Sequence, residues 1–174
     1  MSDQIIKLST QASKILNILR NIAAHKSLFK YKDDFNKSYW EVIFNNFLEI
    51  ALIDWFKLFI LTSDASHWSN TVKDKENFRY ELLKYLSLSQ QAWDEYAASL
   101  QRYRDSMPVL SGQKDNAELY PDLSSVVIAC YAYYAELLKE LNALKNYDYP
   151  VDIREYYRSC LHEATAFTNA AYNV

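Results

Sequence analysis

The sequence predicts an all-α fold, a single domain organised as a bundle of about six helices over residues 1–174. Apolar residues recur at three- and four-residue spacing through most of the chain, the pattern of helices with one buried face. The chain contains one Gly and three Pro, too few turn-forming residues for a β-rich fold. Half of its residues are hydrophobic, which suits one sizeable core at this length.

The first helix is predicted over residues 3–30. Its apolar side chains recur at helical spacing and form one stripe: Ile5, Leu8, Ala12, Ile15, Leu19, Ile22 and Phe29. The polar stretch KYKDDFNK follows and separates this N-terminal helix from the rest of the bundle.

A second helix is predicted from Ser38 to about residue 61. Ser38 and Glu41 have the spacing of a capping box, which satisfies backbone donors at a helix start. Apolar residues surround most of this helix, whereas a helix wetted on one side would carry polar residues there. We therefore expect the second helix at the centre of the bundle.

Two shorter helices are predicted next, the third over about residues 74–86. The charged residues of VKDKENFRYELLK are interpreted as its solvated face. Ser87 or Ser89 is expected to cap the fourth helix, and Pro108 to end it, because a proline disfavours helical geometry in the preceding residue. The side chains expected to face the core are Phe78, Leu82, Leu83, Leu86, Trp93, Tyr96, Leu100, Tyr103 and Met107.

The fifth helix is predicted over about residues 121–146, with Pro121 in its first turn. Asp152 and Glu155 then have capping spacing for a sixth, C-terminal helix over about residues 152–171. The side chains expected to be buried in these two helices are Val126, Val127, Cys130, Tyr134, Leu137, Leu141, Leu144, Ile153, Tyr156, Cys160, Ala164 and Phe167.

Charge, cysteines and hydropathy limit the functional classes. A net charge of −3 gives no overall basic footprint for nucleic acid, although a local basic cleft stays possible. Cys130 and Cys160 lie in apolar helical patterns and are interpreted as buried thiols rather than a disulfide. Cysteine and histidine spacing predicts no metal, and no nucleotide, serine-hydrolase or zinc-protease motif suggests a cofactor or hydrolytic site. With no signal-peptide pattern and polar residues in its longest apolar stretch, the chain is expected to be soluble and cytoplasmic, without membrane contact.

A series of short segments over about residues 38–140 resembles a known family. These are ALIDWFKLF (51–59), SHW (66–68), FRYELLKYL, LQRYRD (100–105), YPDL (120–123) and an aromatic helix with YAYYAELL. In this order and spacing they resemble a bacterial branch of the HEPN superfamily, small helical domains of which many are ribonuclease toxins or abortive-infection proteins. The resemblance implies a HEPN-like bundle, a homodimer, and a role in bacterial defence or in a toxin–antitoxin pair.

The resemblance also implies where a site would lie. In catalytic members an arginine, usually followed by Asn, Asp or His, precedes a histidine; two protomers pair so that both motifs line one cleft, and RNA is cleaved without metal. The arginine would stabilise charge on the phosphoryl group while the histidine moves protons. Arg104 and Asp105 match the first part of this motif, but residues 107–111 read MPVLS, and the next histidine is His162. The implied protein is therefore non-catalytic or weakly active, and it binds RNA or a protein partner near Arg104.

Two other histidines leave an active enzyme open as an alternative. Arg20-Asn21-x-x-x-His25 fits the motif as a string, but five residues on a straight helix turn through about 140°, so the two side chains are expected to diverge. The simpler interpretation is a surface arginine and a histidine at the edge of the core. His67, next to Trp68, is either a cleft histidine near Arg104 or part of a pair that packs the loop after the second helix.

Three functions are thus carried forward. The first is RNA or protein binding at Arg104; of the nearby arginines, Arg102 is expected to face a different direction, into solvent. The second is a metal-independent endoribonuclease using His25 or His67. The third is a structural dimerisation module.

Overall fold

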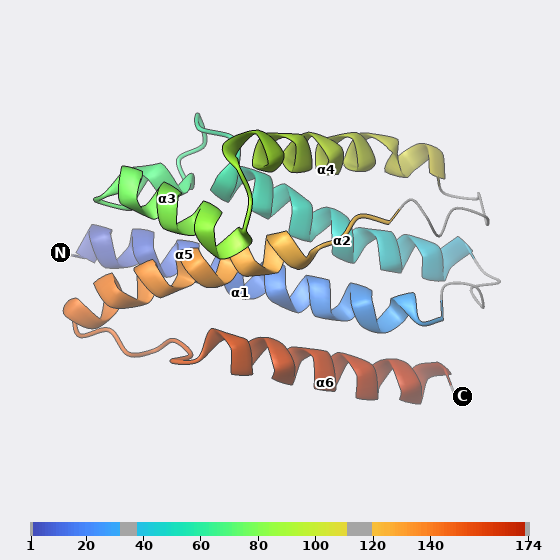
Figure 1. Ribbon diagram of the computed structural model, residues 1–174. Helices are drawn as coiled ribbons and strands as arrows, with labels where there is room; N and C mark the ends of the chain where they lie inside the picture. Colours follow the sequence, from blue (N-terminus) through green and yellow to red (C-terminus); the bar gives the residue numbers. More distant parts are fainter. Residues whose placement is uncertain (1, 32–37, 111–119, 173–174) are drawn as a thin grey trace.

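The computed structural model describes residues 2–31, 38–110 and 120–172, and it shows an all-α bundle (Figure 1). Six α-helices occur in these ranges: α1 (Ser2–Phe29), α2 (Ser38–Phe59), α3 (Lys75–Leu86), α4 (Gln90–Leu110), α5 (Ser124–Ala143) and α6 (Ile153–Tyr172). A short 3-10 turn, η2 (Trp68–Asn70), lies between α2 and α3. These ranges contain no strand, so the predicted fold class is confirmed.

Helix α1, rather than α2, is the helix around which the bundle is built. It packs against α2, α5 and α6, and its stripe of Ile15, Leu19 and Ile22 is completely buried. The prediction that α2 lies at the centre was wrong: Val42 and Ile50 are 50% and 44% exposed. The apolar circumference of α2 has a different cause, because separate sides of the helix face α1 and α4.

Aromatic side chains hold α4 and α5 on α2. Trp55 and Trp93 are almost completely buried, with ring centroids 5.5 Å apart, and Phe59 meets Tyr133 of α5 edge-on at 5.9 Å. The buried hydroxyl of Tyr133 donates to the side chain of Gln11 on α1. Such rings combine a large buried area with favourable edge and tilted contacts, so this cluster positions α4.

Local capping explains several helix ends. The Asp74 carboxylate accepts from the backbone N–H of Asn77 at the start of α3, and Ser87, at φ 55°, ends that helix in the left-handed region. Ser89 is the predicted serine that begins α4, because its hydroxyl accepts from the N–H of Ala92 at 3.1 Å. The Asp152 carboxylate accepts from two backbone N–H groups at the start of α6, as predicted. The side chains of Ser38 and Met107, also used in the predictions, lie outside the described residues.

Both proline predictions were wrong. Helix α4 continues through Pro108 to Leu110, so Pro108 lies in the last turn of the helix, two residues before its end. Pro121 precedes α5 instead of lying in its first turn. The Asp122 carboxylate accepts from the N–H and the hydroxyl of Ser124, so the local turn starts the helix three residues later than predicted.

The buried stripe of α6 differs from the prediction at two positions. Tyr157 and Thr168 are each 7% exposed, whereas Tyr156 is half-buried and Phe167 is 74% exposed. A helical turn of 3.6 residues allows steps of three or four, and contact with α1 selects the four-residue steps here. The hydroxyls of Thr165 and Ser27 on α1 lie 3.0 Å apart and are consistent with this alignment.

Two further predictions concern membrane-spanning helices and the two cysteines. Among the described helices, none combines the length and the hydropathy that a membrane span needs. Cys130 and Cys160 are both buried free thiols, as predicted, and burial raises the pKa of the Cys130 thiol.

Candidate functional site around Arg104

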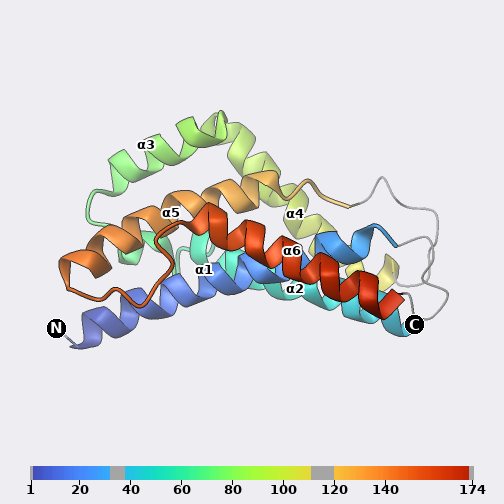
Figure 2. The ribbon, with the colours of Figure 1, turned by 90° about the horizontal axis from the view of Figure 1, so that it is seen from below.

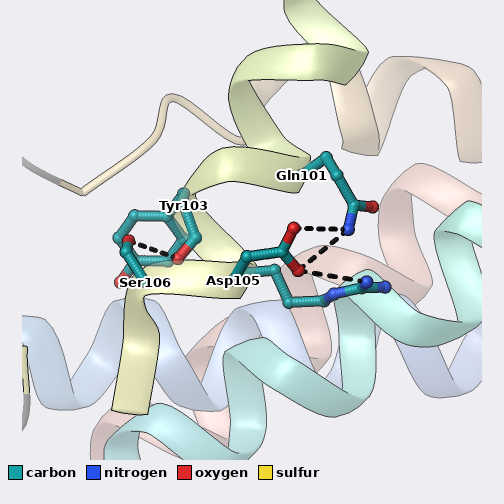
Figure 3. Close-up of polar contacts among 5 residues, drawn as sticks. Gln101, Tyr103, Asp105 and Ser106 are labelled. Atoms are coloured by element: carbon teal, nitrogen blue, oxygen red, sulfur yellow. Dashed lines mark hydrogen bonds and ion pairs between the residues drawn. The ribbon is translucent and has the colours of Figure 1, made fainter. Parts of the chain in front are cut away.

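Arg104 and Asp105 lie near the end of α4, on the side of the bundle away from α6 (Figure 1). A guanidinium nitrogen of Arg104 donates to the Asp105 carboxylate at 3.3 Å. The Gln101 amide donates to both oxygens of the same carboxylate at 2.9 Å, as Figure 3 shows. Because residues four apart are neighbours on a helix face, α4 itself builds this short chain of polar contacts.

The Arg104 side chain is held against the core rather than projecting into water. Its guanidinium carbon lies 5.2 Å from the ring centroid of Phe56, which is buried in α2, and 29% of the side chain is exposed. A planar guanidinium held over a ring loses little further freedom when it meets an anion, while the Asp105 carboxylate offsets part of its charge. Arg102 is exposed, so the two arginines face different directions, as expected from their spacing.

Tyr103 and Ser106 belong to the same turn of α4 as Arg104 and Asp105. The Ser106 hydroxyl donates to the backbone carbonyl of Tyr103 at 2.8 Å (Figure 3). The Tyr103 ring is 6.0 Å from that of Tyr120, and burial, together with Tyr120, raises the pKa of the Tyr103 phenol. Tyr103 therefore stays protonated near neutral pH and acts as a packing residue.

A cavity of about 490 Å³ lies between α2, α4, the start of α3 and the turn η2, and Arg104 itself is not among its lining residues. Phe56 and Gln101, the two neighbours of the Arg104–Asp105 pair, both belong to its wall. His67 and Arg79 also line it. The structure thus places His67 in the wall of the same cavity as Phe56 and Gln101, the neighbours of Arg104.

The His67 side chain nonetheless has a structural role as the N-cap of the turn η2. It is 3% exposed, and its Nδ1 accepts from the backbone N–H of Ser69 at 3.3 Å, which caps the turn η2. Burial lowers the pKa of His67 below its ordinary value, against a hydrogen bond to the backbone of Phe59 and with help from the charge of Arg79. The ring is therefore neutral near pH 7, and one of its nitrogens serves the turn.

Trp68 completes the closing of this end of the bundle. Its ring lies 5.4 Å from that of His67 and 4.9 Å from that of Phe78 on α3. This geometry agrees with the interpretation of the two residues as a loop-packing pair.

Arg79 is the residue of this site that sequence reasoning missed. It had been assigned to a solvated face, yet only 24% of its side chain is exposed. Its guanidinium carbon lies 5.4 Å from the ring centroid of Trp93, and its Nε donates to Gln90 at 2.9 Å. Burial lowers its pKa, and Asp94 opposes that effect. Arg79 lies at helical spacing from the buried Leu82 and Leu86, and this spacing was the signal in the sequence that could have predicted its partial burial.

Arg20 and His25 do not converge. The Arg20 guanidinium donates to the hydroxyl of Tyr156 on α6 at 3.0 Å, and that hydrogen bond raises the pKa of Arg20. His25 is 3% exposed and stacks on Phe44 of α2, with ring centroids 4.1 Å apart. Burial lowers the pKa of His25 to about 4. The divergence predicted from helical phase is what the structure shows.

The described residues offer no obvious metal centre: no group of three or more His, Cys, Asp or Glu side chains among them could hold an ion. What the site offers is an oriented arginine whose neighbours Phe56 and Gln101 line a cavity. No model of a protein family matches the chain, and neither curated proteins nor solved structures include a match.

Proposed function

We propose that this is a HEPN-like protein of the bacterial defence or toxin–antitoxin type that binds RNA at the surface around Arg104, with little or no nuclease activity. The observation that carries the proposal is the orientation of Arg104, whose guanidinium lies over the ring of Phe56, a residue of the cavity wall. A pre-oriented guanidinium suits the two oxygens of a phosphate. The rings in the cavity wall, such as Phe59 and Trp93, are already buried, so the guanidinium rather than base stacking carries the proposal.

The lack of catalysis is argued from the histidines. A general acid or base must reach the proton that it transfers and titrate near the working pH. His67 caps a turn through Nδ1, and His25 is buried among aromatic rings with its pKa near 4. Neither arrangement favours proton transfer to a bound RNA, so binding is supported better than cleavage.

Replacing Arg104 with alanine is expected to weaken RNA binding about tenfold, the loss of roughly one charge-assisted contact to phosphate. The measurement is fluorescence anisotropy of a labelled single-stranded RNA at low and moderate salt. Arg102→Ala is the matched control, since it removes an exposed arginine two residues away on the same helix and is expected to change affinity less than twofold. Equal losses in both variants would indicate a diffuse charge effect and contradict a site at Arg104.

The endoribonuclease alternative is addressed by incubating the protein with total RNA in EDTA. We expect no cleavage by the wild type. Cleavage that disappears in His25→Ala or His67→Ala would establish the enzyme and overturn the non-catalytic proposal. Absence of RNA binding at every salt concentration would leave binding to a protein partner, or the structural dimerisation module.

A further inference from the structure

A second hollow lies on the opposite side of the molecule from Arg104. It is a groove of about 640 Å³ with α1 as its floor and α2 and α6 as its walls. Figure 2 shows α6 running along α1 toward the same end of the bundle at which α2 begins. We call it the α2–α6 groove.

Apolar side chains form both walls. On α2 the wall is the stripe of Trp40, Ile43 and Phe47, and the 44%-exposed Ile50 continues it at helical spacing. On α6 the wall includes Ala164 and Phe167. Ile43, Phe47, Ala164 and Phe167 were expected to be core, yet each is only partly covered by the described residues.

Phe167 is the most informative of these residues. It is 74% exposed while it lines an apolar groove. Burying a phenylalanine side chain is worth about 1.5–3 kcal/mol, so a partner that covers Phe167 gains that contribution. A small ligand held deep in the groove would leave most of this ring in water, whereas a protein surface would cover it.

The groove also carries one positive and one negative side chain. Arg20 lies on the floor, where its hydrogen-bond partner is the neutral hydroxyl of Tyr156. Glu163 lies on the α6 wall and accepts from the Ser159 hydroxyl at 3.4 Å. Because these charges have opposite signs, a two-fold copy of the patch can set each of them against its opposite.

We propose that a second copy of this chain occupies the α2–α6 groove in a two-fold symmetric dimer. In such an interface the same patch is used by both subunits, so it must contain both a projecting group and the space that receives it. Here the 74%-exposed Phe167 on the groove wall is the group that enters the groove of the other copy, and Arg20 of each copy meets Glu163 of the other. The small Ala164 lies between Cys160 and Phe167 on the wall and allows two α6 helices to approach closely about the symmetry axis.

This dimer differs from the one that the family resemblance implies. Helices α4 and α6 lie on opposite sides of the bundle (Figure 1), so pairing through α6 places the two Arg104 residues on outer surfaces. They would not share one cleft, which agrees with a protein that binds but does not cleave. The proposal itself is independent of RNA binding, because no residue of the groove belongs to the Arg104 site.

The test is the molar mass in solution, measured by light scattering after gel filtration and by sedimentation at protein concentrations of about 1–100 µM. The wild type is expected at twice its chain mass of 20.5 kDa. Phe167→Glu is expected to raise the dissociation constant at least about 100-fold, because it buries a charge in an apolar contact. Tyr85→Glu is the control, since Tyr85 is a 64%-exposed aromatic on α3 and its replacement should leave the dimer intact.

A charge exchange tests the symmetric pairing. Arg20→Glu and Glu163→Arg should each weaken the dimer, and the double variant should recover most of the loss. Circular dichroism checks that the variants keep their helix content, which is expected because both side chains are exposed. A monomeric wild type at 100 µM (about the upper limit for a weak specific dimer) overturns the proposal. So does a dimer that resists Phe167→Glu, or one that Arg104→Ala disrupts instead.

Discussion

Replacing Trp93 with alanine is expected to lower the free energy of unfolding by about 3–5 kcal/mol. Trp93 is 1% exposed and contacts the rings of Trp55, Phe59 and Tyr96, so its removal leaves a cavity between α2 and α4. The expected loss is a large share of the stability of a domain of this size. Urea unfolding followed by circular dichroism measures it.

The same substitution is expected to disturb the wall of the cavity near Arg104, because Trp93 also packs against the guanidinium of Arg79 and both residues line that cavity. Tyr85→Ala provides the control: this aromatic is 64% exposed, and its removal should change stability by no more than about 0.5 kcal/mol. A Trp93→Ala protein as stable as this control would show that the aromatic cluster does not hold α4 in place.

Acidification from pH 7 to pH 5 is expected to cost about 2 kcal/mol of stability through His25 alone. The pKa of His25 is about 4 in the folded protein, below the ordinary value of 6.5. Folding therefore favours the neutral ring. Its contribution is fully present above pH 6.5 and is lost as the pH falls toward 4, where the unfolded chain binds the proton first.

The structural cause is that the ring is buried between α1 and α2. The rings of Phe29, Phe44 and Tyr120 surround His25, and its Nδ1 lies 3.3 Å from the Phe44 carbonyl. Protonation would place a charge among these rings, with Lys26 adding repulsion.

The control for this prediction is His25→Phe, which keeps a ring at the position and cannot take up a proton. Urea unfolding of both proteins between pH 7 and pH 5 should give a shallower pH dependence for the variant. His67, whose pKa burial also lowers, accounts for part of what remains. Asp64, Asp122 and Asp152 have lowered pKa values, and their contributions are lost only below about pH 4. Identical slopes for wild type and variant would contradict the assignment to His25.

The helices could be predicted because their signals are local. Asp74, Ser89 and Asp152 act within three residues of themselves, and each cap lies at a helix start, as Asp152 and Ser89 were predicted to do. The two prolines show the limit of the same reasoning. Whether Pro108 ends a helix or Pro121 starts one depends on neighbouring turns and on contacts such as that of the Tyr96 hydroxyl with the Asp122 carbonyl at 2.6 Å.

The candidate site was predictable in part. Helical phase alone separated Arg20 from His25 and Arg102 from Arg104. It could not show that Arg79 packs on Trp93, or that His67 shares a cavity wall with Gln101. Those residues come from different helices and turns, and the sequence carries no measure of the distance between them.

Local patterns in the chain were sufficient to predict the fold class, the number and approximate extent of the helices, and an arginine without a histidine at residues 104–111. Which helix is central, and that Phe167 is exposed while Thr168 is buried, became evident only from the packing of the helices. The packing also decided that His25 lies inside an aromatic core. The physical reason is that periodicity defines a stripe relative to the axis of one helix, whereas burial depends on which neighbour covers that stripe.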